Sequence, residues 1–130
     1  MKLRIKGNSI RLRLGRSEVD RLAMNGAVQE LTIFGSGRGP RLGYEIRAAR
    51  IETVVRASFD GQRIVVLVPA EMINRWASSD QVGIYAMQPT DHGELAVVIE
   101  KDFACIDGDS NEPQEDAFPN PALAAGPRSC

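Results

Sequence analysis

The first fourteen residues alternate between apolar and basic side chains with a period of two. Residues 2–6 and 10–14 each place an apolar side chain at every second position, with a break at residues 7–9. Alternation of this kind is typical of strands that bury one face, so the pattern predicts a β-hairpin. The apolar side chains of this hairpin are Leu3, Ile5, Ile10, Leu12 and Leu14.

A short helix and two more strands are predicted to follow the hairpin. Ser17 is a suitable N-cap residue for the helix, and Asn25-Gly26 is a suitable end. Residues 28–34 and 42–48 are predicted strands because they are rich in apolar and β-branched side chains. The apolar face of the helix is formed by Val19, Leu22 and Ala23.

The second half of the chain shows the same order of patterns. Residues 51–59 and 63–68 are predicted to form a hairpin across Asp60-Gly61, a dipeptide that favours tight turns. Pro69 then suits the first turn of a second helix. The rest of this half comprises the helix side chains Met72, Ile73, Trp76 and Ala77 and predicted strands at residues 82–87 and 95–100.

The two halves align when residue 10 is placed on residue 64, an offset of 54. Most of the agreeing positions are apolar, so the agreement also fits two similar amphipathic units without duplication. We predict a mainly β (α+β) fold, a compact barrel or sandwich in which two pseudo-repeated ββαββ units interleave. The agreeing pairs are Ile10 with Ile64, Leu12 with Val66, Leu14 with Val68, Val19 with Ile73, Arg21 with Arg75, Leu22 with Trp76, Ala23 with Ala77 and Val28 with Val82.

Charge is distributed unevenly along the chain although the total is close to zero. Residues 1–50 carry eleven Lys and Arg against four Asp and Glu, whereas residues 102–130 carry one against six. We therefore expect one β-rich domain over residues 1–103 and an acidic, disordered tail over residues 104–130. No segment has the length of apolar sequence that a membrane span needs, so a cytoplasmic protein without membrane contact is expected.

Candidate catalytic and metal-binding residues are few. Cys105 with His92 and Asp102 is the one grouping that suggests a small cysteine- or metal-dependent enzyme. The predicted strand between His92 and Cys105 would separate the two side chains, and their spacing matches no zinc motif. We therefore assign no catalytic residue, no metal site and no cofactor, and we keep the Cys105 enzyme as the alternative.

Two further motifs resemble ligand-binding loops and are incomplete. Residues 107–111 match the opening of a calcium loop, but Glu112 and Phe118 occupy the places of its glycine and closing glutamate. The glycine-rich segment at residues 35–40 leads into a strand, so it lacks the helix N-terminus that phosphate loops use. We expect a solvated acidic tail and a hairpin loop.

A family resemblance is visible in residues 61–84. The Val68-Pro69-Ala70-Glu71-Met72 helix start and the Ser79-Asp80-Gln81-Val82 turn resemble the swapped-hairpin units of AbrB/SpoVT-type proteins. That resemblance implies a ββαββ unit, two of which build one barrel, and DNA binding in some members. The second half is not basic here, and the first half has Gly15-Arg16-Ser17 in place of the Pro-x-Glu helix start.

The chain as a whole resembles a family of small, uncharacterised bacterial proteins. The residues that carry this resemblance lie at both ends of the chain, and no established activity comes with it. They are KLRIKGNSIRLRL at residues 2–14, EKDFAC at residues 100–105 and FPNP at residues 118–121.

The basic hairpin is the feature that most favours a function. Cations that face one another across two strands destabilise their pairing, and an anionic partner would offset this cost. We predict a non-enzymatic binding or regulatory module, a monomer or homodimer, whose partner is nucleic acid or an anionic protein, with the acidic tail as a competitor in cis. Aromatic residues make up 5% of the chain, which disfavours base stacking. The predicted anion-binding residues are Lys2, Arg4, Lys6, Arg11, Arg13 and Arg16.

Overall fold

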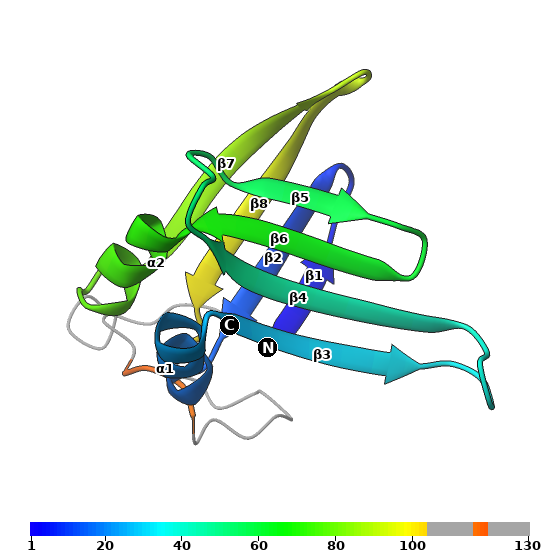
Figure 1. The fold of residues 1–130 in the computed structure, drawn as a ribbon, viewed down its shortest axis with the longest axis horizontal. Coiled ribbons are helices and arrows are strands. Elements are labelled where there is room, and N and C mark those ends of the chain that lie inside the picture. The colour runs from blue at the N-terminus through cyan, green and yellow to red at the C-terminus, as the bar shows by residue number, and fades with distance from the viewer. Residues whose placement is uncertain (104–115, 120–130) are drawn as a thin grey trace.

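Two four-stranded sheets and two helices make up the part of the chain that the computed structural model describes, residues 1–103 and 116–119 (Figure 1). The mainly β fold that the sequence predicts is therefore confirmed. In chain order the elements are β1 (Lys2–Ile5), β2 (Ser9–Leu14), α1 (Arg16–Asn25), β3 (Ala27–Ile33), β4 (Arg41–Ala49), β5 (Arg56–Phe59), β6 (Arg63–Pro69), α2 (Ala70–Ala77), β7 (Gly83–Thr90) and β8 (Gly93–Lys101).

Each sheet contains one hairpin from each half of the chain. Sheet A has the strand order β1-β2-β8-β7, and sheet B has the order β3-β4-β6-β5. The hairpins themselves are antiparallel, whereas β2 pairs with β8 and β4 pairs with β6 in parallel. The first hairpin of each half thus pairs with the last hairpin of the other half, and the two halves interleave.

The two sheets do not close into a barrel, so that form of the prediction is wrong and the arrangement is sandwich-like. Where the edges of the two sheets meet, hydrogen bonds from side chains take the place of backbone hydrogen bonds between strands. At the β5–β7 edge, the Gln88 amide accepts a bond from the Ala57 N–H at 2.7 Å and donates one to the Ala57 carbonyl at 2.9 Å. Near the β1 and β3 edges, the Tyr44 hydroxyl donates to Glu30 at 3.2 Å, and the Met1 carbonyl lies 3.3 Å from that hydroxyl.

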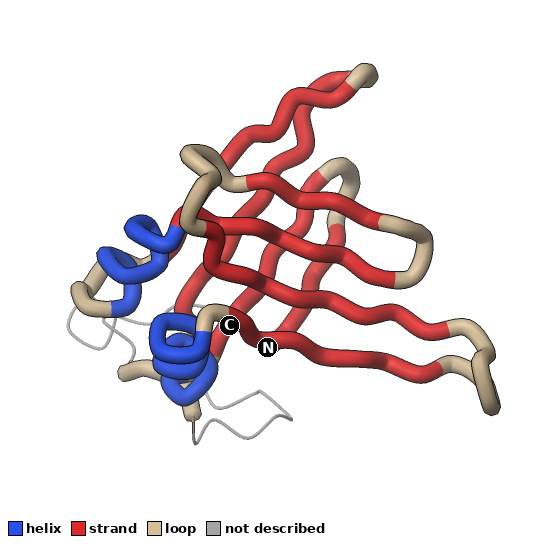
Figure 2. Tube along the Cα trace, in the orientation of Figure 1, coloured by secondary structure: helices blue, strands red, loops and turns tan. Residues whose placement is uncertain are grey.

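The core lies between the sheets, and the helices cover one end of it (Figure 2). Leu22 of α1 and Trp76 of α2 are fully buried there. The indole Nε1–H of Trp76 donates to the Val82 carbonyl at 3.0 Å, so this polar atom is satisfied inside the core. Within residues 1–103 and 116–119, neither helix has the length and apolar character that crossing a membrane would require.

The predicted strand at residues 51–59 is wrong in its first part, since β5 begins only at Arg56. The topology explains the difference. Strand β4 lies on one side of β6 and β5 on the other, so the chain must cross the end of β6 between them. Residues 50–55 make this crossing, with Val55 buried and Ile51 almost fully exposed.

The offset of 54 holds through the helices and fails after them. Val28 pairs with Ile46 on β4, and its counterpart by register on β7 is Ile84, which pairs with Ile99. Val82, which the sequence alignment matches to Val28, is 41% exposed. The connection after α2 is longer than the single Gly26 that ends α1, and this extra length shifts the register.

We expect Gln88→Leu to lower the free energy of unfolding by about 1–3 kcal/mol, because the substitution leaves the Ala57 N–H and carbonyl without the amide that binds them. Urea denaturation would measure the change. Gln62→Leu, at an exposed position in the β5–β6 turn, is the matched control and should cost much less. Equal losses in the two variants would contradict the role given to Gln88.

Candidate nucleic-acid interface

The β1–β2 hairpin places its cations on the outer surface of sheet A. Lys2 pairs with Arg13 and Arg4 pairs with Arg11 across the two antiparallel strands. Of the apolar residues between them, Leu12 and Leu14 are fully buried, whereas Ile5, which was expected to face inward, is 58% exposed because it lies next to the turn of the hairpin. This surface, defined by Lys2, Arg4, Lys6, Arg11 and Arg13, is called the hairpin face below. The structure therefore brings together five of the six residues that the sequence selects.

Glu100 on β8 holds the two cations of β2 in place. Its carboxylate lies 3.3 Å from Arg11 Nε and 3.9 Å from Arg13 Nε. The Tyr85 hydroxyl donates to the same carboxylate at 3.1 Å, and burial together with Glu100 raises the pKa of this phenol. One carboxylate shared between two guanidinium groups leaves an excess of positive charge on the strand.

The remaining hairpin cations are more exposed. Lys2 Nζ lies 2.8 Å from Asp102 Oδ2, just past the end of β8. Arg4 and Lys6 are exposed, and their side chains form no ion pair with any of residues 1–103 or 116–119. These two side chains are the most available for a phosphate in trans. The Lys2–Asp102 pair is only partly exposed, since the Asp102 side chain is 19% exposed.

Arg16, the sixth predicted residue, lies apart from the hairpin face at the start of α1. Asp116 binds at this helix end: its carbonyl accepts the Arg16 N–H at 2.7 Å. Its carboxylate accepts the Ser17 N–H at 3.0 Å and the Ser17 hydroxyl at 2.8 Å. The prediction that Ser17 is the N-cap is wrong. Gly15 holds that position, and the Gly15 N–H donates to Glu18 at 3.0 Å.

Gly15 is required by this contact. A Cβ atom at residue 15 would lie 2.8 Å from Asp116 Cγ and 2.9 Å from its carbonyl oxygen, closer than real Cβ contacts. The φ of Gly15 is −73°, which any residue adopts, so backbone strain does not explain the glycine. The glycine is explained by the space that Asp116 occupies beside it.

Phe118 anchors the same segment against the end of the core. Its N–H donates to the Asp102 carbonyl at 2.8 Å, and its ring meets Phe103 edge-on at 5.9 Å between centroids. The ammonium of Lys101 lies 5.4 Å from the Phe118 ring centre and 5.9 Å from that of Trp76, within cation–π range. Burial lowers the pKa of Lys101, whose ammonium donates to the Ser79 carbonyl at 2.6 Å. Residues 104–115 and 120–130 of the predicted tail lie outside the described residues.

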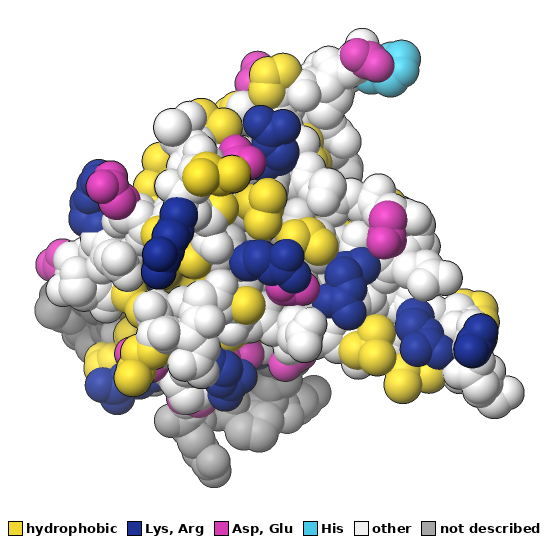
Figure 3. Space-filling model, viewed as in Figure 1, with side chains coloured by type: hydrophobic (Ala, Val, Ile, Leu, Met, Phe, Trp, Pro, Cys, Tyr) yellow, Lys and Arg dark blue, Asp and Glu magenta, His cyan; other side chains and the backbone are white. Residues whose placement is uncertain are grey.

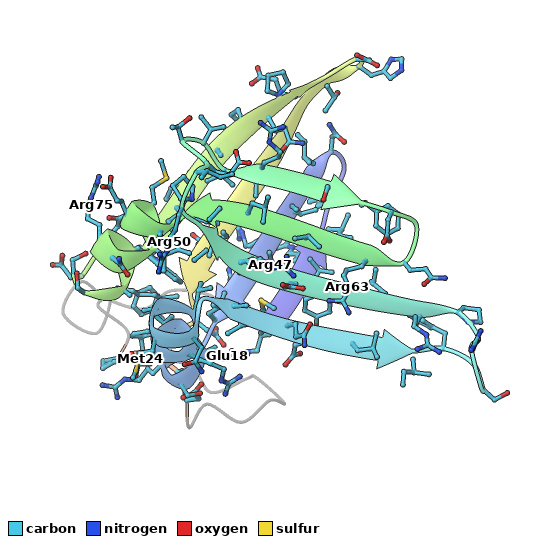
Figure 4. The ribbon with its side chains drawn as sticks, viewed as in Figure 1. Glu18, Met24, Arg47, Arg50, Arg63 and Arg75 are labelled. Carbon is cyan, nitrogen blue, oxygen red and sulfur yellow. The ribbon has the colours of Figure 1, made fainter. Side chains whose placement is uncertain are left out.

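A second set of cations, which sequence reasoning missed, lies on the outer side of sheet B. Figure 3 shows dark blue Lys and Arg side chains across this face, and Figure 4 labels four arginines along it. They come from α2, the β4–β5 crossing, β4 and β6, so no single stretch of sequence reveals them. Part of this set could have been recognised in the sequence, because every second residue from 41 to 47 is charged or glycine and would share the outer face of a strand. These residues are Arg41, Gly43, Glu45 and Arg47. The four residues, called the arginine stripe below, are Arg75, Arg50, Arg47 and Arg63.

Two of the three residues proposed for a cysteine- or metal-dependent enzyme, His92 and Asp102, are not brought together. His92 is exposed in the β7–β8 turn, while Asp102 follows the other end of β8. At about 3.3 Å per residue, the nine residues of β8 separate them by about 30 Å. Cys105 lies outside the described residues. Among residues 1–103 and 116–119, no three His, Cys, Asp or Glu side chains are grouped to hold a metal ion.

The two incomplete ligand loops add no site. Residues 35–40 connect β3 to β4 as a hairpin loop, and Arg41 donates to the Gly37 carbonyl at 2.8 Å across it. The calcium-like residues 107–111 lie outside the described residues. A groove of about 580 Å³ lies between the β5 and β7 edges, and its lining, mostly apolar, includes Arg56, Tyr85 and Gln88.

Comparison with known proteins gives a family and no function. A family model described as a family of unknown function (DUF7009) matches residues 1–122. The match therefore includes the hairpin face, the arginine stripe and the segment from Asp116 to Phe118 that contacts the start of α1 and the end of β8. No curated protein matches the chain, and no solved structure does.

The contact between Gly15 and Asp116 predicts non-additive substitutions. Asp116→Ala removes the acceptor at the start of α1 and should cost about 0.5–2 kcal/mol of stability. Gly15→Ala should cost a similar amount because its Cβ displaces Asp116. The double variant should cost little more than either alone, as measured by thermal or urea unfolding. Costs that simply add would show that Gly15 and Asp116 act independently.

The same contact should depend on pH. Bonds from the Ser17 N–H and hydroxyl hold the pKa of Asp116 below its ordinary 3.8. A carboxyl with a lowered pKa stabilises the bound state above its ordinary value, and this stability is lost as the pH falls through the lower pKa. NMR spectra should therefore show the Ser17 amide signal shifting below pH 3.8. Asp116→Asn should abolish this shift, and a midpoint above 3.8 would contradict the assignment.

Proposed function

This chain belongs to the DUF7009 family, a family of unknown function, and we propose that it is a non-enzymatic module that binds duplex nucleic acid through the hairpin face. The observation that carries the proposal is the register of the hairpin. Lys2 opposite Arg13 and Arg4 opposite Arg11 set like charges side by side on one surface. Such pairs cost tenths of a kcal/mol each without an anion nearby.

The carboxylates that contact this face do not remove the excess charge. Glu100 forms ion pairs with both Arg11 and Arg13, and Asp102 forms one with Lys2. Arg4 and Lys6 remain exposed to a partner. A phosphate backbone supplies regularly spaced anions, and each contact releases condensed counterions, which drives association at low salt.

The chemistry of the face favours the backbone of a duplex over single strands. Its side chains are long cations on a sheet, and the aromatic ring beside them, Tyr85, is engaged with Glu100. Single-strand binding usually needs several exposed rings on which bases stack. Phosphate contacts carry little sequence information, so we expect weak dependence on base sequence.

The acidic segment acts in this proposal as a competitor within the chain. Residues 104–115 are joined at one end to β8 beside the Lys2–Asp102 pair and at the other to Asp116 at α1. Four of these residues are acidic: Asp107, Asp109, Glu112 and Glu115. We infer that this segment, because it is covalently joined to the domain, competes with a phosphate for the hairpin face.

We also propose that the two halves are AbrB/SpoVT-type units joined in one chain. The exchange of hairpins between halves supports this proposal, since each unit completes the sheet of the other. The chain departs from the barrel of that type because its two sheets remain separate at the edge where Gln88 lies. We further propose that the protein is bacterial, on the resemblance carried by residues 2–14, 100–105 and 118–121, and cytoplasmic, on the lack of a long apolar segment in the sequence.

We expect Arg4→Gln/Lys6→Gln to weaken binding to a mixed-sequence duplex and to lower the slope of log affinity against log salt by about 2, one unit per lost phosphate contact. Fluorescence anisotropy across a salt series would measure both quantities. The control is Arg21→Gln/Arg38→Gln, which removes two charges on α1 and in the β3–β4 loop. If both variants keep the original slope, the hairpin face does not bind phosphates.

Substituting the four acidic residues of the competitor segment by their amides should raise the affinity for the duplex. Asp116 is left in place so that the α1 contact persists in this variant. The increase should be largest at low salt, because screening weakens the competition as well. Unchanged affinity would remove the competitor from the proposal and leave the hairpin face as it stands.

A further inference from the structure

The arginine stripe crosses the molecule on the side opposite to the hairpin face. Figure 4 shows Arg75, Arg50, Arg47 and Arg63 in a line across sheet B, from α2 along β4. Arg47 and Arg63 extend outward from neighbouring strands because their inward neighbours Ile46 and Ile64 are buried. Arg47 and Arg63 therefore lie on the outer face of sheet B, and Arg50 and Arg75 continue the line past the end of the sheet onto the β4–β5 crossing and α2.

A buried carboxylate fixes the centre of the stripe. Glu45 on β4 is 4% exposed and receives Arg47 Nε at 2.8 Å and Arg63 Nη1 at 3.0 Å. The side chains of Arg47 and Arg63 nevertheless remain 56% and 40% exposed. Glu45 cannot satisfy all five N–H donors of each guanidinium, so both groups can also bind an outside anion. Two arginines held on one carboxylate form a preorganised cationic pair.

A looser arrangement of the same kind occurs on the hairpin face, where Glu100 forms ion pairs with Arg11 at 3.3 Å and Arg13 at 3.9 Å. In both sheets the carboxylate lies on the second strand of a half's last hairpin, β4 or β8, beside the parallel partner strand. Each outer face of the sandwich thus has a carboxylate that forms ion pairs with two arginines, with further exposed cations around it. The two faces point in opposite directions because the inner faces of both sheets form the core.

We propose that the arginine stripe is a second duplex-binding face and that one molecule bridges two duplexes. This inference rests on the proposed function of the hairpin face. A duplex is stiff over about 150 base pairs, so a single short duplex cannot bend around the sandwich to reach both faces. Simultaneous use of the two faces therefore requires two separate duplexes.

The test is capture of one duplex by another. A biotinylated duplex on beads is incubated with the full-length protein and then with a fluorescent duplex of unrelated sequence. Arg50→Gln/Arg75→Gln removes two stripe cations and leaves the Glu45 pair with Arg47 and Arg63 intact. We expect the protein to remain on the beads and capture of the fluorescent duplex to fall roughly tenfold.

Two controls separate the possible outcomes. Arg21→Gln/Arg38→Gln makes the same change in net charge outside both faces and should retain capture. Capture that survives loss of the stripe, for example through self-association of the protein, overturns the inference and leaves the hairpin face standing. The same holds if the unaltered protein binds the beads and captures nothing. Failure of the unaltered protein to bind the beads at low salt overturns the proposed function and the inference with it.

Discussion

The parallel pairings of β2 with β8 and of β4 with β6 are the interactions on which the rest of the structure depends. Each half of the chain supplies two hairpins whose apolar sides cannot cover one another within that half. Exchange of hairpins builds two sheets whose inner faces cover each other, with Leu12, Ile46, Val66 and Ile99 all buried by the result. The exchange also sets the surface: it brings Glu100 beside Arg11 and places Arg63 beside Glu45.

Local pattern was sufficient to predict most of the elements and the outward side of the first hairpin. The alternation of Lys2, Arg4, Arg11 and Arg13 with leucine and isoleucine fixes which side of the strands faces outward, and the structure places the charges there. Most of the failures are long-range, whereas the N-cap of α1, which is Gly15 and not Ser17, is a local one. Arg47 and Arg63 come from different halves, so only the parallel pairing of β4 and β6 makes them neighbours. Asp116 could not be assigned to α1 because no local rule connects residues 99 positions apart.

Acidic groups position cations in this protein more than they neutralise them. Glu45 and Glu100 each bind two arginines, and Asp116 binds backbone and hydroxyl donors instead of a guanidinium. The near-zero net charge of the sequence therefore gives little indication of the fields at its surfaces. What the sequence could show was the gradient along the chain. That gradient indicates the hairpin face but not the arginine stripe, since Arg63 and Arg75 come from the less basic second half.

The exchange of hairpins has a consequence during synthesis on the ribosome. Strand β2 is made early, yet its parallel partner β8 is the last strand of the fold to emerge. At about 5–20 residues per second, β2 waits roughly 5–20 seconds with one edge unpaired. An unpaired apolar edge is a site of aggregation, and outward-facing cations are the usual protection against it. Arg11 and Arg13 lie on that waiting strand, so they would keep nascent chains apart before any partner is bound.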